Sequence, residues 1–184
     1  MDVQSAVERA RTGDREAFGE LYEHFCSKIY NYLYYHLNGR THLAEDLTEE
    51  VFVKMIEKFH TYRDRGLPFS AWMFRIAHNH LIDYLRAQPK QGITSIDDCH
   101  DLPEQHAERT LELALTHSEL RSAIATLTED QRRVVMLRFL QGMSTLETAH
   151  VLGKSEDAVK KLQARGLQVL KRALHSSRQA LAVA

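Results

Sequence analysis

The sequence predicts an all-α protein made of two small helical domains joined by a flexible linker. Helices are predicted because apolar residues recur every three or four positions on both sides of the chain's middle. The division is predicted because this periodicity stops between residues 88 and 107, where proline, glycine and acidic residues replace large apolar ones. We therefore expect domains at residues 1–87 and 108–184, with an acidic linker at 88–107.

The composition is that of a globular protein without membrane insertion. The 184 residues allow one or two domains, and no apolar run is long enough to span a bilayer. The N-terminus lacks the basic-then-apolar order of a signal peptide, so a cytoplasmic location is predicted. In that compartment Cys26 and Cys99 are not expected to form a disulfide, and two cysteines alone do not make a zinc site.

The first domain is predicted to begin with a short helix over 3–11, followed by a longer one that Asp14 caps and that ends near Gly39. Apolar residues in the longer helix recur at helical spacing. Four tyrosines crowd its second half, so we expect some to pack in the core and others to lie at its rim; the alternative is a base-stacking platform. The two sets are Ala17, Leu21, Phe25, Ile29 and Leu33, and Tyr30, Tyr32, Tyr34 and Tyr35.

Two further helices, over about 41–59 and from near Pro68 onward, complete that domain around a basic loop. Each has one apolar stripe. In the second of these helices Arg75 and Asn79 fall one turn apart on a different face. The stripes are Leu43, Leu47, Val51, Met55 and Phe59, and then Phe69, Trp72, Met73, Ile76, Ala77, Leu81 and Tyr84.

Helical spacing resumes near residue 108, and two capping boxes then mark helix starts, at Thr128 with Gln131 and at Ser144 with Glu147. Gly142 should end the first of these helices. The predicted core face of that helix, which begins at Thr128, is Val134, Val135, Leu137, Phe139 and Leu140.

The end of the chain has the spacing of a helix-turn-helix. Gly153 can adopt the positive φ that a tight turn needs, and Ser155 is a good N-cap for the second helix. From residue 111 onward there are 11 Lys and Arg against 7 Asp and Glu, a basic balance that suits DNA binding. A solvated helix face is the alternative. The residues that carry the motif are Ala149, Leu152, Gly153, Val159 and Leu162.

The segment 45–86 resembles the second conserved domain of bacterial sigma factors of the extracytoplasmic-function (ECF) group, and 149–165 resembles the fourth. The first match rests on the acidic Glu45-Asp46-Leu47 with Glu50-Val51-Phe52, then on Ala71-Trp72, Arg75-Ile76-Ala77, Asn79, Asp83 and Arg86. The resemblance implies a sigma factor that binds core RNA polymerase and directs it to promoters.

The resemblance also implies site residues. Those for the minus-35 element are Ser155, Glu156, Lys160, Lys161, Ala164 and Arg165. Those for the minus-10 element are Tyr62, Arg63, Arg65, Arg75 and Asn79. Those for core polymerase are Asp46, Glu49, Glu50 and Phe52. The implied partners are promoter DNA, the beta-prime clamp and beta flap of core RNA polymerase, and an anti-sigma factor.

Three residues depart from the family pattern: Glu49 replaces a glutamine, His78 an arginine and Thr148 an isoleucine. They leave open two alternatives, a stand-alone helix-turn-helix regulator and a sigma-like decoy that binds an anti-sigma factor. No phosphate-binding loop, nucleophile elbow or metal-binding spacing is present, so no enzyme, cofactor or metal is expected. The linker permits both packed and separate domains.

Overall fold

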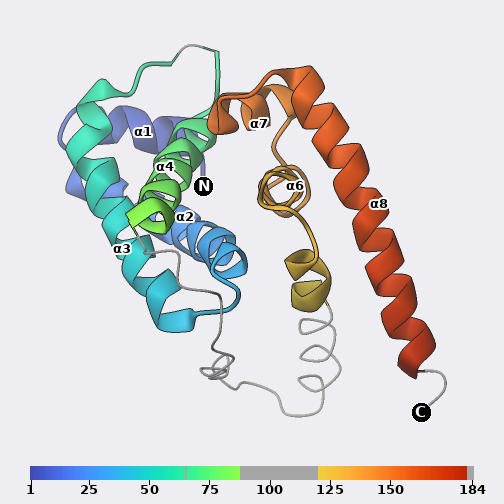
Figure 1. The fold of residues 1–184 in the computed structure, drawn as a ribbon. Coiled ribbons are helices and arrows are strands. Elements are labelled where there is room, and N and C mark those ends of the chain that lie inside the picture. Colours follow the sequence, from blue (N-terminus) through green and yellow to red (C-terminus); the bar gives the residue numbers. More distant parts are fainter. Residues whose placement is uncertain (65, 88–119, 182–184) are drawn as a thin grey trace.

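The computed structural model describes residues 1–64, 66–87 and 120–181, with side chains as far as 174. The regular elements in these ranges are all helical, which confirms the all-α prediction (Figure 1). The predicted linker lies outside the described residues, as does the start of the second domain. The helices are α1 (Val3–Arg11), α2 (Arg15–His36), α3 (Thr41–Lys58), η1 (Phe59–Thr61), α4 (Phe69–Ala87), α6 (Glu129–Val135), η2 (Met136–Leu140), α7 (Thr145–Leu152) and α8 (Glu156–Leu181).

Helix α2 is the centre of the N-terminal group. The Asp14 carboxylate accepts hydrogen bonds from the backbone N–H groups of Glu16 and Ala17, as an N-cap should. The five apolar residues predicted for its inner face are all buried. Tyr32 is buried, whereas Tyr30, Tyr34 and Tyr35 are half-buried at the core's edge. The interpretation of core and rim is therefore confirmed.

Helices α3 and α4 begin and end close to their predicted bounds. Gly66, with φ +78°, lies in the loop between them, and α4 follows directly after Pro68. Phe69 packs edge-on against Tyr62, with ring centroids 5.1 Å apart, and also contacts Trp72. This aromatic cluster fixes the loop against the start of α4.

The helices of the C-terminal group begin at the predicted caps, since both capping boxes are formed. One prediction is wrong: Phe139 and Leu140 are 53% and 44% exposed and do not contribute to the core face. The reason is that α6 widens into the π-helical turn η2, which adds a residue to the turn and rotates the following side chains outward. Val134, Val135 and Leu137 are buried as predicted.

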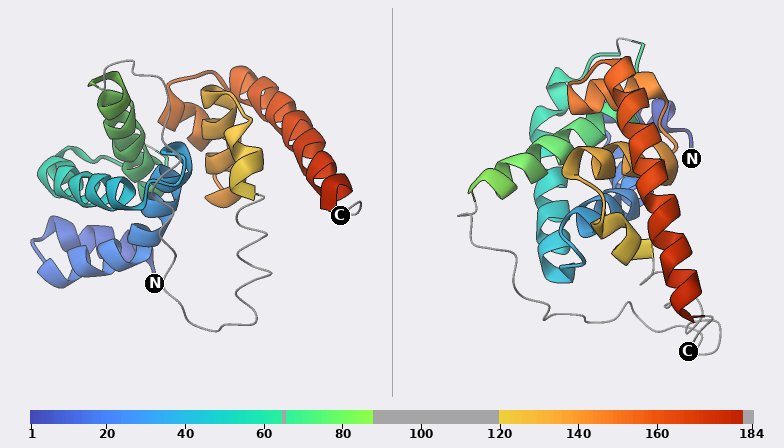
Figure 2. Two further views of the ribbon diagram at one scale, coloured as in Figure 1. Left: turned by 60° about the horizontal axis from the view of Figure 1, so that its bottom comes forward. Right: turned by 45° about the vertical axis from the view of Figure 1, so that its right-hand side comes forward.

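The two helical groups pack against each other, a point that the linker left open. Met136, Leu137 and Val151 belong to the same apolar core as the N-terminal helices. Helix α7 lies beside α4, and α6 approaches α2. Figure 2 shows α1–α4 gathered on one side and α6–α8 on the other, most clearly in its left view. Polar contacts also cross the interface between the two groups, which we call the seam. Among them, Arg132 Nη1 donates to Asn38 Oδ1 (3.1 Å) and Arg121 Nη1 donates to Tyr34 Oη (3.0 Å).

Candidate nucleic-acid interface

A basic cleft of about 420 Å³ lies between α3, the loop after η1 and α4. Lysine and arginine side chains line it together with Trp72, an arrangement that offers phosphate-binding charge beside an aromatic face. Asn79 adds an amide that can donate and accept hydrogen bonds at once. The lining residues are Lys54, Lys58, Thr61, Tyr62, Arg63, Leu67, Pro68, Trp72, Arg75, Ile76, Asn79, His80, Asp83 and His150.

Four of the five residues predicted for the minus-10 element line this cleft, and Arg65 lies outside the described residues. Arg63 is exposed, and its Nη1 donates to the carbonyl oxygen of His60 at 2.8 Å. Arg75 and Asn79 are both exposed on α4. Tyr62 differs from these three because it is only 2% exposed, under the guanidinium of Arg11. Its ring therefore serves mainly as the floor of the cleft.

Several cleft residues were missed by the sequence reasoning. Lys54 and Lys58 are one helical turn apart on α3, so their spacing could have indicated a common basic face. His150 comes from α7, and its Nε2 lies 3.2 Å from Arg75 Nη1. Burial and the nearby Arg75 lower the pKa of His150, which keeps its imidazole neutral as an acceptor. No local pattern could have indicated that contact.

The acidic residues of α3 form a second surface. Asp46, Glu49 and Glu50 are exposed, and Glu50 Oε2 lies 2.7 Å from Nε2 of His80 on α4. Phe52 is 5% exposed because its ring packs on Tyr22, with centroids 4.7 Å apart. Phe52 therefore supports the surface from below.

Exposed apolar side chains continue that acidic surface. Val53 and Ile56 are 54% and 56% exposed, and with Glu49 they fall at helical spacing on one face of α3. Exposed apolar residues beside charged ones are typical of a protein-binding surface. These two residues could have been noticed in the sequence as apolar residues that lie off the buried stripe of the helix.

The helix-turn-helix is formed as predicted. Gly153 has φ +61° and ends α7 in the left-handed conformation. Val134 of α6, Ala149 of α7 and Val159 of α8 form a small core that holds the helices together. Ser155 Oγ accepts a hydrogen bond from the Ala158 N–H at 3.2 Å, so Ser155 caps the start of α8.

All six residues predicted for the minus-35 element lie at the start of α8, and all are exposed. Lys160, Lys161, Ala164 and Arg165 fall one turn apart on a single face of the helix. Lys160 Nζ is 3.7 Å from Asp157 Oδ1, a loose exposed pair that leaves the ammonium group accessible. Helix α8 is 26 residues long, or about 39 Å, and projects along one side of the molecule (Figure 1).

The unusual residues Thr148 and His78 are both buried. Thr148 is fully buried in α7, and its hydroxyl has no hydrogen-bond partner, which is unusual for a buried polar group. His78 is 8% exposed and its Nδ1 lies 3.1 Å from Tyr32 Oη. The side chain at position 78 thus lies in the seam between the two helical groups. His80, two residues on, faces α3, so the two histidines lie on different faces of α4.

Residues 21–91 match the family model of sigma-70 region 2, and residues 117–170 match that of sigma-70 region 4. The chain is 37% identical over 175 residues to the ECF RNA polymerase sigma factor BldN of Streptomyces coelicolor, with 94% of this chain and 66% of that relative covered. It is 35% identical over 173 residues to the ECF RNA polymerase sigma factor SigX of Bacillus subtilis, with 90% of this chain and 88% of that relative covered.

The fold is also that of a solved sigma factor, RpoE in complex with the anti-sigma factor NepR from Bartonella quintana. The TM-score is 0.70 at 20% identity, and the alignment covers 86% of this chain and 96% of the other. The chain therefore belongs to the sigma-70 family of bacterial RNA polymerase sigma factors. Within that family it belongs to the ECF group, as the resemblance of its motifs predicted.

None of the helices in the described ranges is long and apolar enough to cross a membrane.

Proposed function

We propose that this sigma factor binds core RNA polymerase and directs it to promoters with two separate DNA contacts. The observation that carries the proposal is the presence, in one chain, of a basic cleft within the region 2 match and a helix-turn-helix within the region 4 match. A regulator that binds its operator without polymerase needs only the helix-turn-helix. We further propose that the chain acts in the cytoplasm, by binding and without catalysis.

The cleft is proposed to hold the unwound minus-10 strand. Taking a base out of the stack costs a few kcal/mol, which stacking and hydrogen bonds in a pocket can offset. Trp72 supplies an aromatic surface, Asn79 an amide, and Arg63 and Arg75 positive charge for the backbone phosphates. Lys54 and Lys58 are proposed as additional phosphate contacts because they line the opposite wall.

The start of α8 is proposed to enter the major groove at the minus-35 element. Lys160, Lys161 and Arg165 are exposed on one face, at the end of the helix that first meets the groove in such motifs. Ala164 can contribute only an apolar contact, for example with a thymine methyl group. Ser155 and the N-terminus of the helix can donate hydrogen bonds to phosphates.

The acidic and apolar surface of α3 is proposed to dock on the beta-prime clamp of core polymerase, and the C-terminal domain on the beta flap. Asp46, Glu49 and Glu50 supply charge, while Val53 and Ile56 supply apolar area. An anti-sigma factor is proposed as a regulator, and RpoE with NepR provides an example of that kind of complex on this fold.

Substitutions at Lys160 and Arg165 test the minus-35 assignment. Each residue changed to Ala should lower run-off transcription from promoters that need the minus-35 element by roughly tenfold, the effect of removing one good hydrogen-bonding side chain from the groove. Binding to core polymerase should be unchanged. Lys171→Ala, which changes an exposed lysine farther along α8, is the matched control. Equal loss of transcription and of polymerase binding in a folded variant would contradict the assignment.

A further inference from the structure

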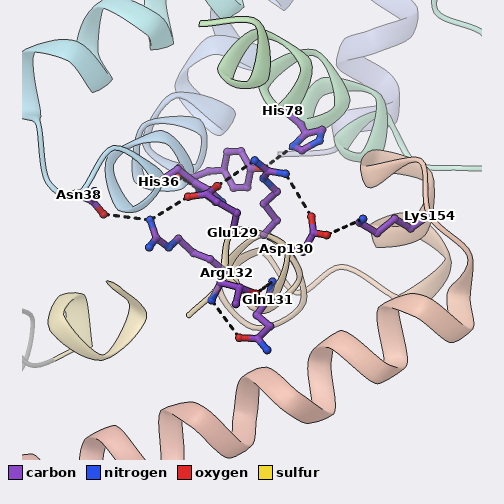
Figure 3. A network of polar contacts seen from close by, with 11 residues as sticks. His36, Asn38, His78, Glu129, Asp130, Gln131, Arg132 and Lys154 are labelled. Atoms are coloured by element: carbon purple, nitrogen blue, oxygen red, sulfur yellow. Dashed lines mark hydrogen bonds and ion pairs between the residues drawn. The ribbon is translucent and has the colours of Figure 1, made fainter. Parts of the chain in front are cut away.

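The seam between the two helical groups contains two buried histidines that the proposed function does not use. His36 on α2 is 3% exposed and His78 on α4 is 8% exposed. Tyr32 connects them, since its carbonyl oxygen lies 2.6 Å from His36 Nδ1 and its hydroxyl lies 3.1 Å from His78 Nδ1. Figure 3 shows His36 and His78 on the N-terminal side of the seam, across from the α6 residues Glu129, Asp130 and Arg132.

The groups facing these imidazoles from the C-terminal side are mainly cationic. Arg132 and Arg133 of α6 lie beside His36, and Arg133, Asp130 and Lys154 lie near His78. The Asp130 carboxylate is already bound by Arg133 (3.4 Å) and Lys154 (3.0 Å).

The second carboxylate of α6 is also occupied. Glu129 is bound by Arg133 at 3.0 Å and lies 3.6 Å from Arg132. The two carboxylates of α6 at the seam are therefore already paired with cations, although Asp130 still raises the pKa of His78 by its charge. A positive charge on either imidazole would therefore be buried beside other cations.

The hydrogen bonds at His36 also require the neutral form. The carbonyl oxygen of Tyr32 can only accept, so His36 Nδ1 carries the proton and Nε2 holds a lone pair. That Nε2 is buried without a partner, so protonation would leave both a charge and an N–H group unsatisfied there. Burial lowers the pKa of His36 to about 3 and that of His78 to about 4, and the nearby arginines act in the same direction.

We propose that this seam is an acid-sensitive latch: proton uptake by His36 and His78 releases α6–α8 from the N-terminal helices. Release would also free the cleft, because Arg75 is hydrogen-bonded to His150 and α7 lies beside α4 in the packed arrangement. The benefit to minus-10 binding rests on the proposed function, whereas the separation of the domains does not.

The direction of the pH effect follows from the lowered pKa values. The packed form is fully stable above the ordinary histidine pKa of about 6.5 and weakens as the pH falls toward 4. If separation restores the ordinary pKa, each histidine favours the open form by about fourfold at pH 6.0 and about tenfold at pH 5.5. Together they shift the equilibrium roughly 100-fold at pH 5.5. His150 adds a smaller effect of the same sign.

The test is a distance measurement between spin labels in the full chain, with Cys26 and Cys99 changed to Ser. Labels replace Arg15 on α2 and Lys171 on α8, both exposed. Between pH 7.5 and pH 5.5 the ratio of long-distance to short-distance populations should rise roughly 100-fold. His36→Gln with His78→Gln should remove nearly all of this rise. His42→Gln is the control and should leave it intact, because His42 is exposed on α3.

Circular dichroism at both pH values checks that the helices remain folded. If the double variant does not fold, His78→Gln alone should reduce the rise in the population ratio from roughly 100-fold to about tenfold. The latch is refuted if the distances do not change with pH, if the double variant responds as strongly as the native chain, or if helical signal is lost together with separation. None of these readouts requires polymerase or DNA, so failure here leaves the proposed function standing.

Discussion

Thr148 offers a direct measurement of the cost of a buried hydroxyl in the helix-turn-helix. The side chain is fully buried in α7, and its Oγ1 has no hydrogen-bond partner. Thr148→Val keeps the shape and removes the unsatisfied group. Because an unpaired buried hydroxyl costs about 1–3 kcal/mol, we expect the variant to be more stable by about 1–2 kcal/mol.

Thr48 on α3 provides the matched control. It is 4% exposed and also lies within a helix, but its Oγ1 donates to the Ala44 carbonyl oxygen at 2.6 Å. Thr48→Val therefore removes a satisfied hydroxyl and should be neutral or destabilising by up to about 1 kcal/mol. The contrast between the two threonines isolates the effect of the missing partner.

Urea unfolding followed by circular dichroism measures both variants. With a slope of roughly 2 kcal/mol per molar urea, the midpoint for Thr148→Val should rise by about 0.5–1 M. The midpoint for Thr48→Val should stay level or fall. The reasoning is refuted if Thr148→Val lowers the midpoint, because the hydroxyl would then be making a favourable interaction.

Three further changes test separate parts of the structure. Gly153→Ala puts a side chain at φ +61° and should cost about 1–2 kcal/mol, measured by urea unfolding, whereas Gly153→Asn should cost less. Gly19→Ala, in the interior of α2 where the added methyl group would meet nothing within 4 Å beyond its chain neighbours and the backbone of its own helix, should stabilise by about 0.5–1 kcal/mol in the same assay; a decrease in stability would contradict the open surroundings of this position. Lys160→Ala should reduce by about 0.9 the slope of log affinity against log salt for a minus-35 duplex bound to holoenzyme, and an unchanged slope would remove Lys160 from the phosphate contacts.

The features that could be predicted from the sequence are those encoded over a few turns of chain. Both capping boxes and the turn at Gly153 form as predicted, because each depends on residues three or four positions apart. The minus-35 residues share a face for the same reason. The exposure of Phe139 was missed because the wider turn of η2 changes the helical spacing locally.

The features that escaped prediction depend on packing between distant segments. His150 joins the cleft only because α7 lies beside α4, and no spacing indicates which helix a histidine will face. The sequence marks His78 only as a departure from the arginine of the family pattern, whereas the structure places its imidazole in the seam next to Tyr32.

Run-off transcription with purified core RNA polymerase and a library of promoters tests the central proposal most directly. With this chain added, core polymerase should start at a defined set of sites that it does not use alone, and the chain should co-purify with it. If the folded chain neither binds core polymerase nor changes the start sites, it is not a working sigma factor. Binding to a palindromic duplex without polymerase would instead favour a stand-alone regulator.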